Sequence, residues 1–212
     1  MHSAPVSRSR VLKPLMIGAM LTIIGHIVCS ADEWRLSSSW APEPSLLEQL
    51  DAESAGSGFT IRPPRGYQLI KQTGPNGSHV FGWKGGQRPD GVSPYLMVSV
   101  APIPPGEHSA EGLEQALDAF LGGVQRRRTS WARTPTERGH IGALEFVRAT
   151  WSGVEPSRNI KMHGFSYVTA TGEAIVQISS QDVDPGDETT LKLAEASALT
   201  FKGVDRNAAK SP

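Results

Sequence analysis

Short apolar runs with alternating apolar and polar positions, divided by Pro and Gly, follow one another from Phe59 onward. Alternation with a period of two is typical of strands that bury one face of a sheet. The pattern predicts strands at residues 59–61, 67–71, 79–84, 95–101, 131–137, 141–151, 159–169 and 174–181. Thr171-Gly172 supplies turn residues between the last two and predicts a hairpin there.

Two segments instead have the three- and four-residue spacing of an amphipathic helix. The first follows Ser109, a favourable N-cap residue, and its apolar stripe consists of Leu113, Ala116, Leu117, Phe120, Leu121 and Val124. The second begins at Asp187, and its stripe consists of Leu191, Ala194, Ala198 and Leu199. The order sheet, helix, sheet, helix predicts an α+β fold, a mostly antiparallel β-sheet with helices packed on it.

The N-terminus has the three parts of a secretory signal. A basic segment at residues 8–13 precedes an apolar stretch at residues 15–28. This stretch is too short to span a bilayer core, which needs about 20 residues in a helix. Small residues follow at Ser30 and Ala31. We therefore expect residues 1–30 to be a signal peptide, cleaved near Ser30/Ala31, and the protein to be extracytoplasmic, either periplasmic or secreted. The alternative is an uncleaved signal anchor.

Composition divides the rest of the chain into three parts. Residues 31–57 are rich in Ser, Pro and acidic residues with little periodicity, which predicts a flexible linker. Residues 58–203 contain nearly all of the strand and helix signals and form the predicted folded domain. Residues 204–212 are polar and are predicted to be a disordered tail.

Charge and cysteine content exclude several kinds of protein. The chain has 21 basic and 21 acidic residues, so it has no excess of positive charge for a nucleic-acid partner. Its one cysteine, Cys29, precedes the expected cleavage site. The mature protein would then have no disulfide, no thiolate metal site and no cysteine nucleophile.

Three segments resemble the PsbP-like superfamily, which includes photosystem II extrinsic proteins, a yeast Ran-binding factor and many bacterial secreted proteins. Phe59-Thr-Ile-Arg-Pro-Pro-Arg-Gly-Tyr67 looks like the opening motif of that superfamily, Ile141–Phe146 like its Gly-containing strand, and Ser197–Phe201 like its closing helix. Together with the helix after Ser109, the resemblance covers about residues 58–202. It implies an α/β/α sandwich used mainly as a binding or accessory module, without a shared active site.

The sequence contains no complete catalytic or metal-binding motif. Ser166 follows Gly164 in a sequence similar to a nucleophile elbow, but Val168 replaces the second glycine and Ser166 falls inside a predicted strand. The histidines have no close pair or HExxH spacing, so the sequence predicts no metal site and no cofactor. An extracytoplasmic enzyme with an unrecognised site stays as the alternative function, with His163, Glu145 or Asp182 brought together by the sheet.

Two groups of residues are candidates for partner binding. Arg126, Arg127 and Arg128 could bind a phosphate or an acidic partner, because guanidinium groups suit that task, or they could simply cap a helix C-terminus. Trp34 and Trp40 lie in the predicted linker with little to pack against. The leading hypothesis is an exported, non-enzymatic binding or accessory protein. Its partner would be an unknown protein or small ligand, not nucleic acid, with membrane contact only if the signal is uncleaved.

Overall fold

The computed structural model describes residues 38–74, 77–89, 91–103, 109–172, 174–184 and 188–203, which all belong to one compact unit. The predicted signal peptide and the predicted tail lie outside the described residues. No helix in these ranges is long and apolar enough to cross a membrane. The elements are β1 (Ser38–Ser39), α1 (Pro44–Leu47), β2 (Ser54–Gly56), β3 (Phe59–Ile61), β4 (Gln68–Thr73), β5 (His79–Lys84), β6 (Tyr95–Pro102), α2 (Ala110–Gln125), β7 (Thr129–Arg133), β8 (Glu137–Ile141), β9 (Leu144–Glu155), β10 (Ile160–Thr171), β11 (Ala174–Val183), α3 (Glu188–Ala198) and β12 (Lys202–Gly203).

The described strands form a large sheet of nine strands and a small sheet of three. The large sheet has the order β1-β8-β9-β10-β11-β6-β5-β4, and β7 also pairs with β9. All of its pairs are antiparallel except β1 with β8. The small sheet has the order β12-β3-β2. The prediction of a mostly antiparallel sheet is therefore confirmed.

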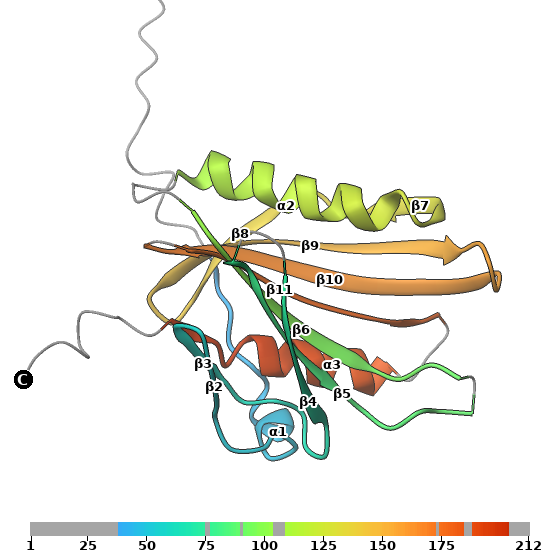
Figure 1. Ribbon diagram of the computed structural model, residues 1–212, viewed down its shortest axis with the longest axis horizontal. Coiled ribbons are helices and arrows are strands. Elements are labelled where there is room, and N and C mark those ends of the chain that lie inside the picture. The colour runs from blue at the N-terminus through green and yellow to red at the C-terminus, as the bar shows by residue number, and fades with distance from the viewer. Residues whose placement is uncertain are drawn as a thin grey trace, which may run out of the picture. The chain divides into compact units, whose positions relative to one another are not determined.

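Helices lie on both faces of the large sheet, α2 on one and α3 on the other (Figure 1). α2 packs on β9 and β10, and its buried leucines join Val147, Ala149, Trp151, Met162 and Val168 in one hydrophobic cluster. The opposite face, covered by α3 and the small sheet, contains the larger cluster, with Phe59, Trp83, Phe146, Phe165 and Tyr167 among its members. The fold therefore has three layers, α2, the large sheet and α3, with one hydrophobic cluster on each face of the sheet.

Both predicted helices are confirmed. The Ser109 hydroxyl accepts a hydrogen bond from the Gly112 backbone N–H at 3.1 Å, which satisfies one of the unpaired donors at the start of α2. Leu113, Leu117 and Leu121 are buried, as the stripe predicts. In α3 the buried residues include Ala194 and Ala198, while Asp187, the predicted first residue, lies outside the described residues.

The strands predicted at 131–137 and 141–151 are placed differently in the structure. β7 ends at Arg133, before Pro135, and residues 137–141 form the separate strand β8. A two-residue turn at Gly142-Ala143 then reverses the chain into β9, with Ile141 opposite Leu144. Gly142 has φ +59°, which glycine adopts without the steric cost that a Cβ brings. The Ile141–Phe146 segment is therefore a hairpin rather than one strand.

The linker prediction is wrong for residues 38–57. Ser38 and Ser39 pair with β8, and residues 54–56 pair with β3. Leu50 is only 2 % exposed, and its backbone bridges to Pro64. Ser, Pro and acidic composition indicated mobility, but these backbone pairs and the buried Leu50 anchor the segment to the domain. Residues 31–37 of the predicted linker lie outside the described residues.

Candidate ligand-binding groove

A groove of about 420 Å³ lies between α2 and the large sheet, and we call it the α2 groove. It exists because α2 covers β9 and β10 and leaves part of the neighbouring strands β11 and β6 uncovered on this face. The apolar part of its lining consists of Met97, Ala119, Phe120, Val124 and Trp151. The polar part consists of Tyr95, Arg127, Ser166, Gln177, Ser179 and Gln181, with Gly123 and Ser180 also contributing.

Trp151 has a fixed position in this lining. A Cβ on Gly164, the residue opposite Trp151 in β10, would lie 2.8 Å from the indole ring, so the ring lies directly over a glycine backbone. Trp131 also stacks on Trp151, with ring centroids 5.3 Å apart and an interplanar angle of 20°. These two contacts restrict the orientation of the indole.

The sheet side of the groove carries buried polar groups that are weakly satisfied within the protein. Gln177 is 6 % exposed and Ser166 is 1 % exposed. Gln177 Nε2 donates to Ser166 Oγ at 3.5 Å, which is the only hydrogen bond of the Gln177 side chain among the described residues. Because an amide can donate two hydrogen bonds and accept two, Gln177 has capacity left for a ligand.

The structure places the three predicted arginines at the C-terminal end of α2. Arg126 is exposed, Arg127 lines the groove, and Arg128 is half-buried. The Arg128 guanidinium lies 5.8 Å from the Trp151 ring centroid and donates to Gln181 Oε1 at 3.2 Å. Burial lowers the pKa of Arg128, and the charge of Arg127 lowers it further. The structure thus places two of the three arginines beside groove residues.

The two candidate tryptophans have different outcomes. Trp34 lies outside the described residues. Trp40, which the sequence left with little to pack against, packs on the larger core cluster. Its ring makes an edge-to-face contact with Tyr167, with centroids 5.4 Å apart. Most of its apolar surface is therefore used in folding.

The residues named for an enzyme are not assembled into one site. His163 and Asp182 are direct neighbours in β10 and β11, but both Asp182 oxygens bind the Arg88 guanidinium. Glu145 lies on β9, seven positions from Ser152, the residue opposite His163. At about 3.3 Å per residue this is roughly 23 Å, and an odd number of positions puts Glu145 on the other face of the sheet. Acid–base catalysis by these three residues needs a much shorter distance.

A second cavity, of about 450 Å³, lies on the α3 face and is lined by residues including Arg133, Thr150, His163 and Glu195. The carboxylate of Glu195 in this cavity already accepts hydrogen bonds from the protein. Tyr167 Oη donates to Glu195 Oε1 at 2.7 Å, and Arg148 donates to the same oxygen at 2.5 Å. Burial, followed by the negative charge of Glu195, raises the pKa of Tyr167. This network joins β9, β10 and α3 and serves the fold.

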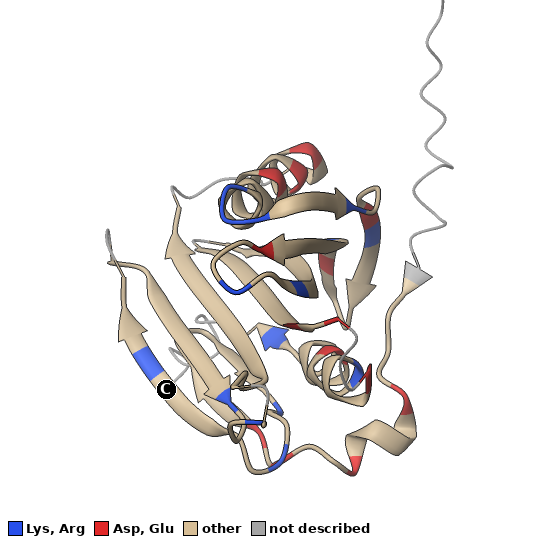
Figure 2. Ribbon diagram, turned by 90° about the vertical axis from the view of Figure 1, so that its right-hand side faces the viewer, with Lys and Arg blue, Asp and Glu red and all other residues tan. Residues whose placement is uncertain are grey.

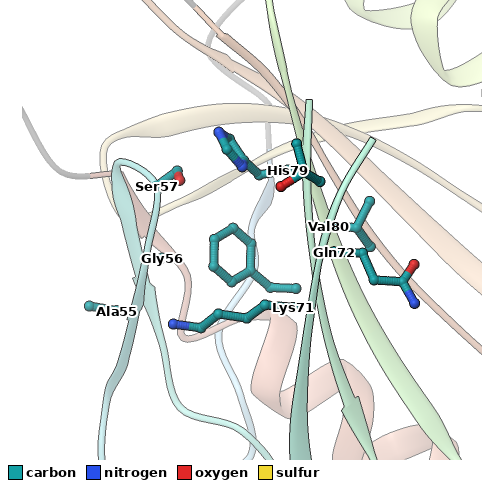
Figure 3. Close-up of a pocket in the computed structure, with 9 residues that line it drawn as sticks. Ala55, Gly56, Ser57, Lys71, Gln72, His79 and Val80 are labelled. Atoms are coloured by element: carbon teal, nitrogen blue, oxygen red, sulfur yellow. The ribbon is translucent and has the colours of Figure 1, made fainter. Parts of the chain in front are cut away.

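A third pocket of about 400 Å³ lies between the β2–β3 turn and strands β4 and β5. Figure 3 shows Lys71 and His79 pointing towards Ala55, Gly56 and Ser57, while Gln72 points to the other face. The Lys71 ammonium lies 5.7 Å from the ring centroid of Phe81, which also lines the pocket. Among the described residues no group of three or more His, Cys, Asp or Glu side chains could hold a metal ion.

Comparison with known proteins identifies the fold. No family model and no curated protein sequence matches the chain. A solved structure of cyanobacterial PsbP (CyanoP) from Synechocystis sp. PCC 6803 matches with a TM-score of 0.53 and 13 % identity, over 72 % of this chain and 91 % of that one. The fold is PsbP-like. The resemblance found in the sequence is thereby confirmed for the fold.

Two other solved structures have lower TM-scores. A protein from Bacteroides thetaiotaomicron VPI-5482 matches with a TM-score of 0.48 and 14 % identity, over 74 % of this chain, and this chain spans only half of its length. LpqN of Mycobacterium tuberculosis, described as involved in cell envelope biogenesis, matches with a TM-score of 0.49 and 10 % identity, over 79 % of this chain and 99 % of that one.

Most of the lining of the α2 groove was not found from the sequence. Gln177, Ser179 and Gln181 alternate along β11, so they put polar side chains on the sheet face that in β9 and β10 carries part of the core. Polar residues at every second position of a buried strand are a usable signal. Ser166 was interpreted as an ordinary strand serine, and it does lie inside β10.

Proposed function

We propose that the protein is a non-enzymatic binding or accessory protein that works outside the cytoplasm and holds its ligand in the α2 groove. The groove itself is the observation that supports this function. Its volume of about 420 Å³ is within the range of roughly 300–1,000 Å³ typical of ligand pockets. It combines apolar walls with a few polar groups of fixed position, which is how such sites bind and orient a small molecule.

The chemistry of the lining favours binding over catalysis. Tyr95 and Arg127 are the two ionisable side chains among its described residues. Burial raises the pKa of Tyr95, so its phenol stays neutral near pH 7 and cannot act as a base. Arginine stays protonated at that pH. General acid–base catalysis near neutral pH uses groups with pKa values near 7, and the buried Tyr95 phenol is not such a group.

A comparison of two tryptophan variants tests the groove as the binding site. Ser179→Trp would fill the groove, since Ser179 lines it from β11. Ala101→Trp is the matched control, because Ala101 is on the same sheet face and about 13 Å from Met97 along β6. We expect native mass spectrometry of protein from its own host to show a bound small molecule in wild type and Ala101→Trp. Retention of that molecule by a folded Ser179→Trp variant would contradict the proposal.

Export is the second part of the proposal, and the pattern of residues 1–30 supports it. The intact mass of the native protein tests it together with cell fractionation. Cleavage predicts a mass that starts at Ala31 or Asp32, in an extracytoplasmic fraction. A full-length chain in the membrane fraction would favour the uncleaved anchor, and a full-length cytoplasmic protein would contradict export.

A further inference from the structure

We propose, building on the proposed function, that the α2 groove binds an amphiphile with a single anionic head, whose apolar tail lies against Phe120, Val124 and Trp151 and whose head binds Arg127. A fatty acid is the simplest molecule of this class. The inference goes beyond the proposed function because it fixes the charge of the ligand and its direction in the groove.

Unpaired positive charge gathers at one end of the groove. Six of the described arginines have carboxylate partners: Arg65, Arg88, Arg133, Arg138, Arg148 and Arg158. Arg126, Arg127 and Arg128 have none among the described residues. Figure 2 shows them as a continuous blue segment where α2 leads into β7. The Glu155 carboxylate offsets part of the Arg128 charge without forming a salt bridge to it, so this end of the groove keeps a net positive charge.

Helix capping uses only one of the three guanidinium nitrogens of Arg127. Arg127 Nε donates to the Gly123 carbonyl oxygen at 3.2 Å, as expected of a cation at a helix C-terminus. The two terminal nitrogens of Arg127 have no hydrogen bond to a described residue. A guanidinium can donate five hydrogen bonds, so Arg127 can cap the helix and bind a carboxylate at once.

Arg128 is held in place behind the lining and adds to the positive potential. It contacts Trp151, Gln181 and the Met162 sulfur, and its Nε is buried without a partner among the described residues. Its nearest neighbour in the chain, Arg127, is also a cation. A bound anion would relieve the repulsion between these two charges, which gives the site a physical reason to prefer a negative head.

Apolar surface lies next to this charge in the groove. Phe120 and Val124 stand one helical turn apart on α2, and both are partly buried against the cluster beneath the helix. The Trp151 indole and Met97 face them from the sheet side of the groove. A head on Arg127 therefore places the adjoining tail between helix and sheet, where it loses contact with water.

Isothermal titration with three octyl compounds tests the assignment: octanoate, octanol and octylammonium have similar tails and differ in the head. We expect octanoate to bind about 10- to 100-fold more tightly than octanol, since hydrogen bonds to charged groups give differences of that size. Octylammonium should bind more weakly still. The preference should decrease at high salt, because salt screens exposed charges.

Two single variants locate the head. Arg127→Gln should reduce octanoate affinity to nearly that of octanol, while Arg126→Gln makes the same charge change one residue away, outside the lining, and should have a much smaller effect. Equal effects of both variants would overturn binding at Arg127, because a diffuse field would then explain the preference. Equal binding of octanoate and octanol in the groove would refute the anionic head but leave the proposed function intact. Absence of binding by all three compounds would refute the ligand class, whereas the proposed function is decided separately by the Ser179→Trp comparison.

Discussion

Gly164 lies beneath the Trp151 ring, which lines the groove. A Cβ there would collide with the carbonyl oxygen of Ser180 and lie 2.8 Å from the Trp151 ring. Because the Ser180 oxygen belongs to the backbone of a paired strand, it cannot move away easily to make room for the Cβ. We expect Gly164→Ala to lower the free energy of unfolding by about 1–3 kcal/mol, measured by urea denaturation. Gly86→Ala, where a Cβ meets nothing within 4 Å, is the control and should change stability by less than about 0.5 kcal/mol.

Tyr167 gives a prediction with a defined pH dependence. Tyr167→Phe removes the hydrogen bond to Glu195 and should cost about 0.5–1.5 kcal/mol at pH 7. Burial raises the pKa of Tyr167 in the folded protein above its ordinary value of 10.0. The stability that depends on the protonated phenol is then complete below pH 10 and decreases as pH rises further. Wild type should therefore lose stability faster than the variant above pH 10, so that their difference narrows; a constant difference would contradict this account.

Individual functional residues were only partly predictable. The arginine triplet stands out in the sequence because three adjacent cations follow an amphipathic stripe. Gln177 belongs to the alternating polar residues of β11, but its hydrogen bond to Ser166 could not be predicted, because the neighbouring strand brings Ser166 to it. The packing of Trp40 could not be predicted either, because its partner, Tyr167, is more than a hundred positions away in the sequence.

At the scale of elements, the N-cap of α2 offers a direct test. Ser109→Ala removes the acceptor for the Gly112 N–H and should lower the free energy of unfolding by about 1 kcal/mol. Thermal unfolding followed by circular dichroism measures the change. Ser109→Asp keeps an acceptor at the same place and should restore most of the loss. An alanine variant as stable as wild type would mean that the cap contributes nothing.

Elements with strong local signals could be predicted, and those that depend on pairing could not. The strands at 59–61 and 79–84 have the predicted bounds, since Pro and Gly residues flank them in the sequence. The β8–β9 hairpin was missed because its two-residue turn contains only Gly142 as a signal, inside an apolar run that also fits one long strand. The pairing of residues 38–39 with β8 depends on a strand about a hundred positions away.

At the scale of the whole molecule, the α+β class and the packing of helices on the sheet followed from the order of the elements. The α2 groove did not. The number of strands that a helix covers depends on where the helix crosses the sheet. The main contacts of α2 are with β9 and β10. The amphipathic stripe specifies which side of α2 faces the sheet, but not which strands lie beneath it.

The central claim is that the α2 groove is the binding site, and chemical-shift mapping tests it most directly. Backbone amide signals of ¹⁵N-labelled protein would be followed during titration with octanoate. The account predicts that the largest shifts gather at Gly123, Ser166 and Ser179, which line the groove from α2, β10 and β11. Saturating shifts that gather instead at Ala55–Ser57, or around His163 and Glu195, would place the site in another pocket and contradict the account.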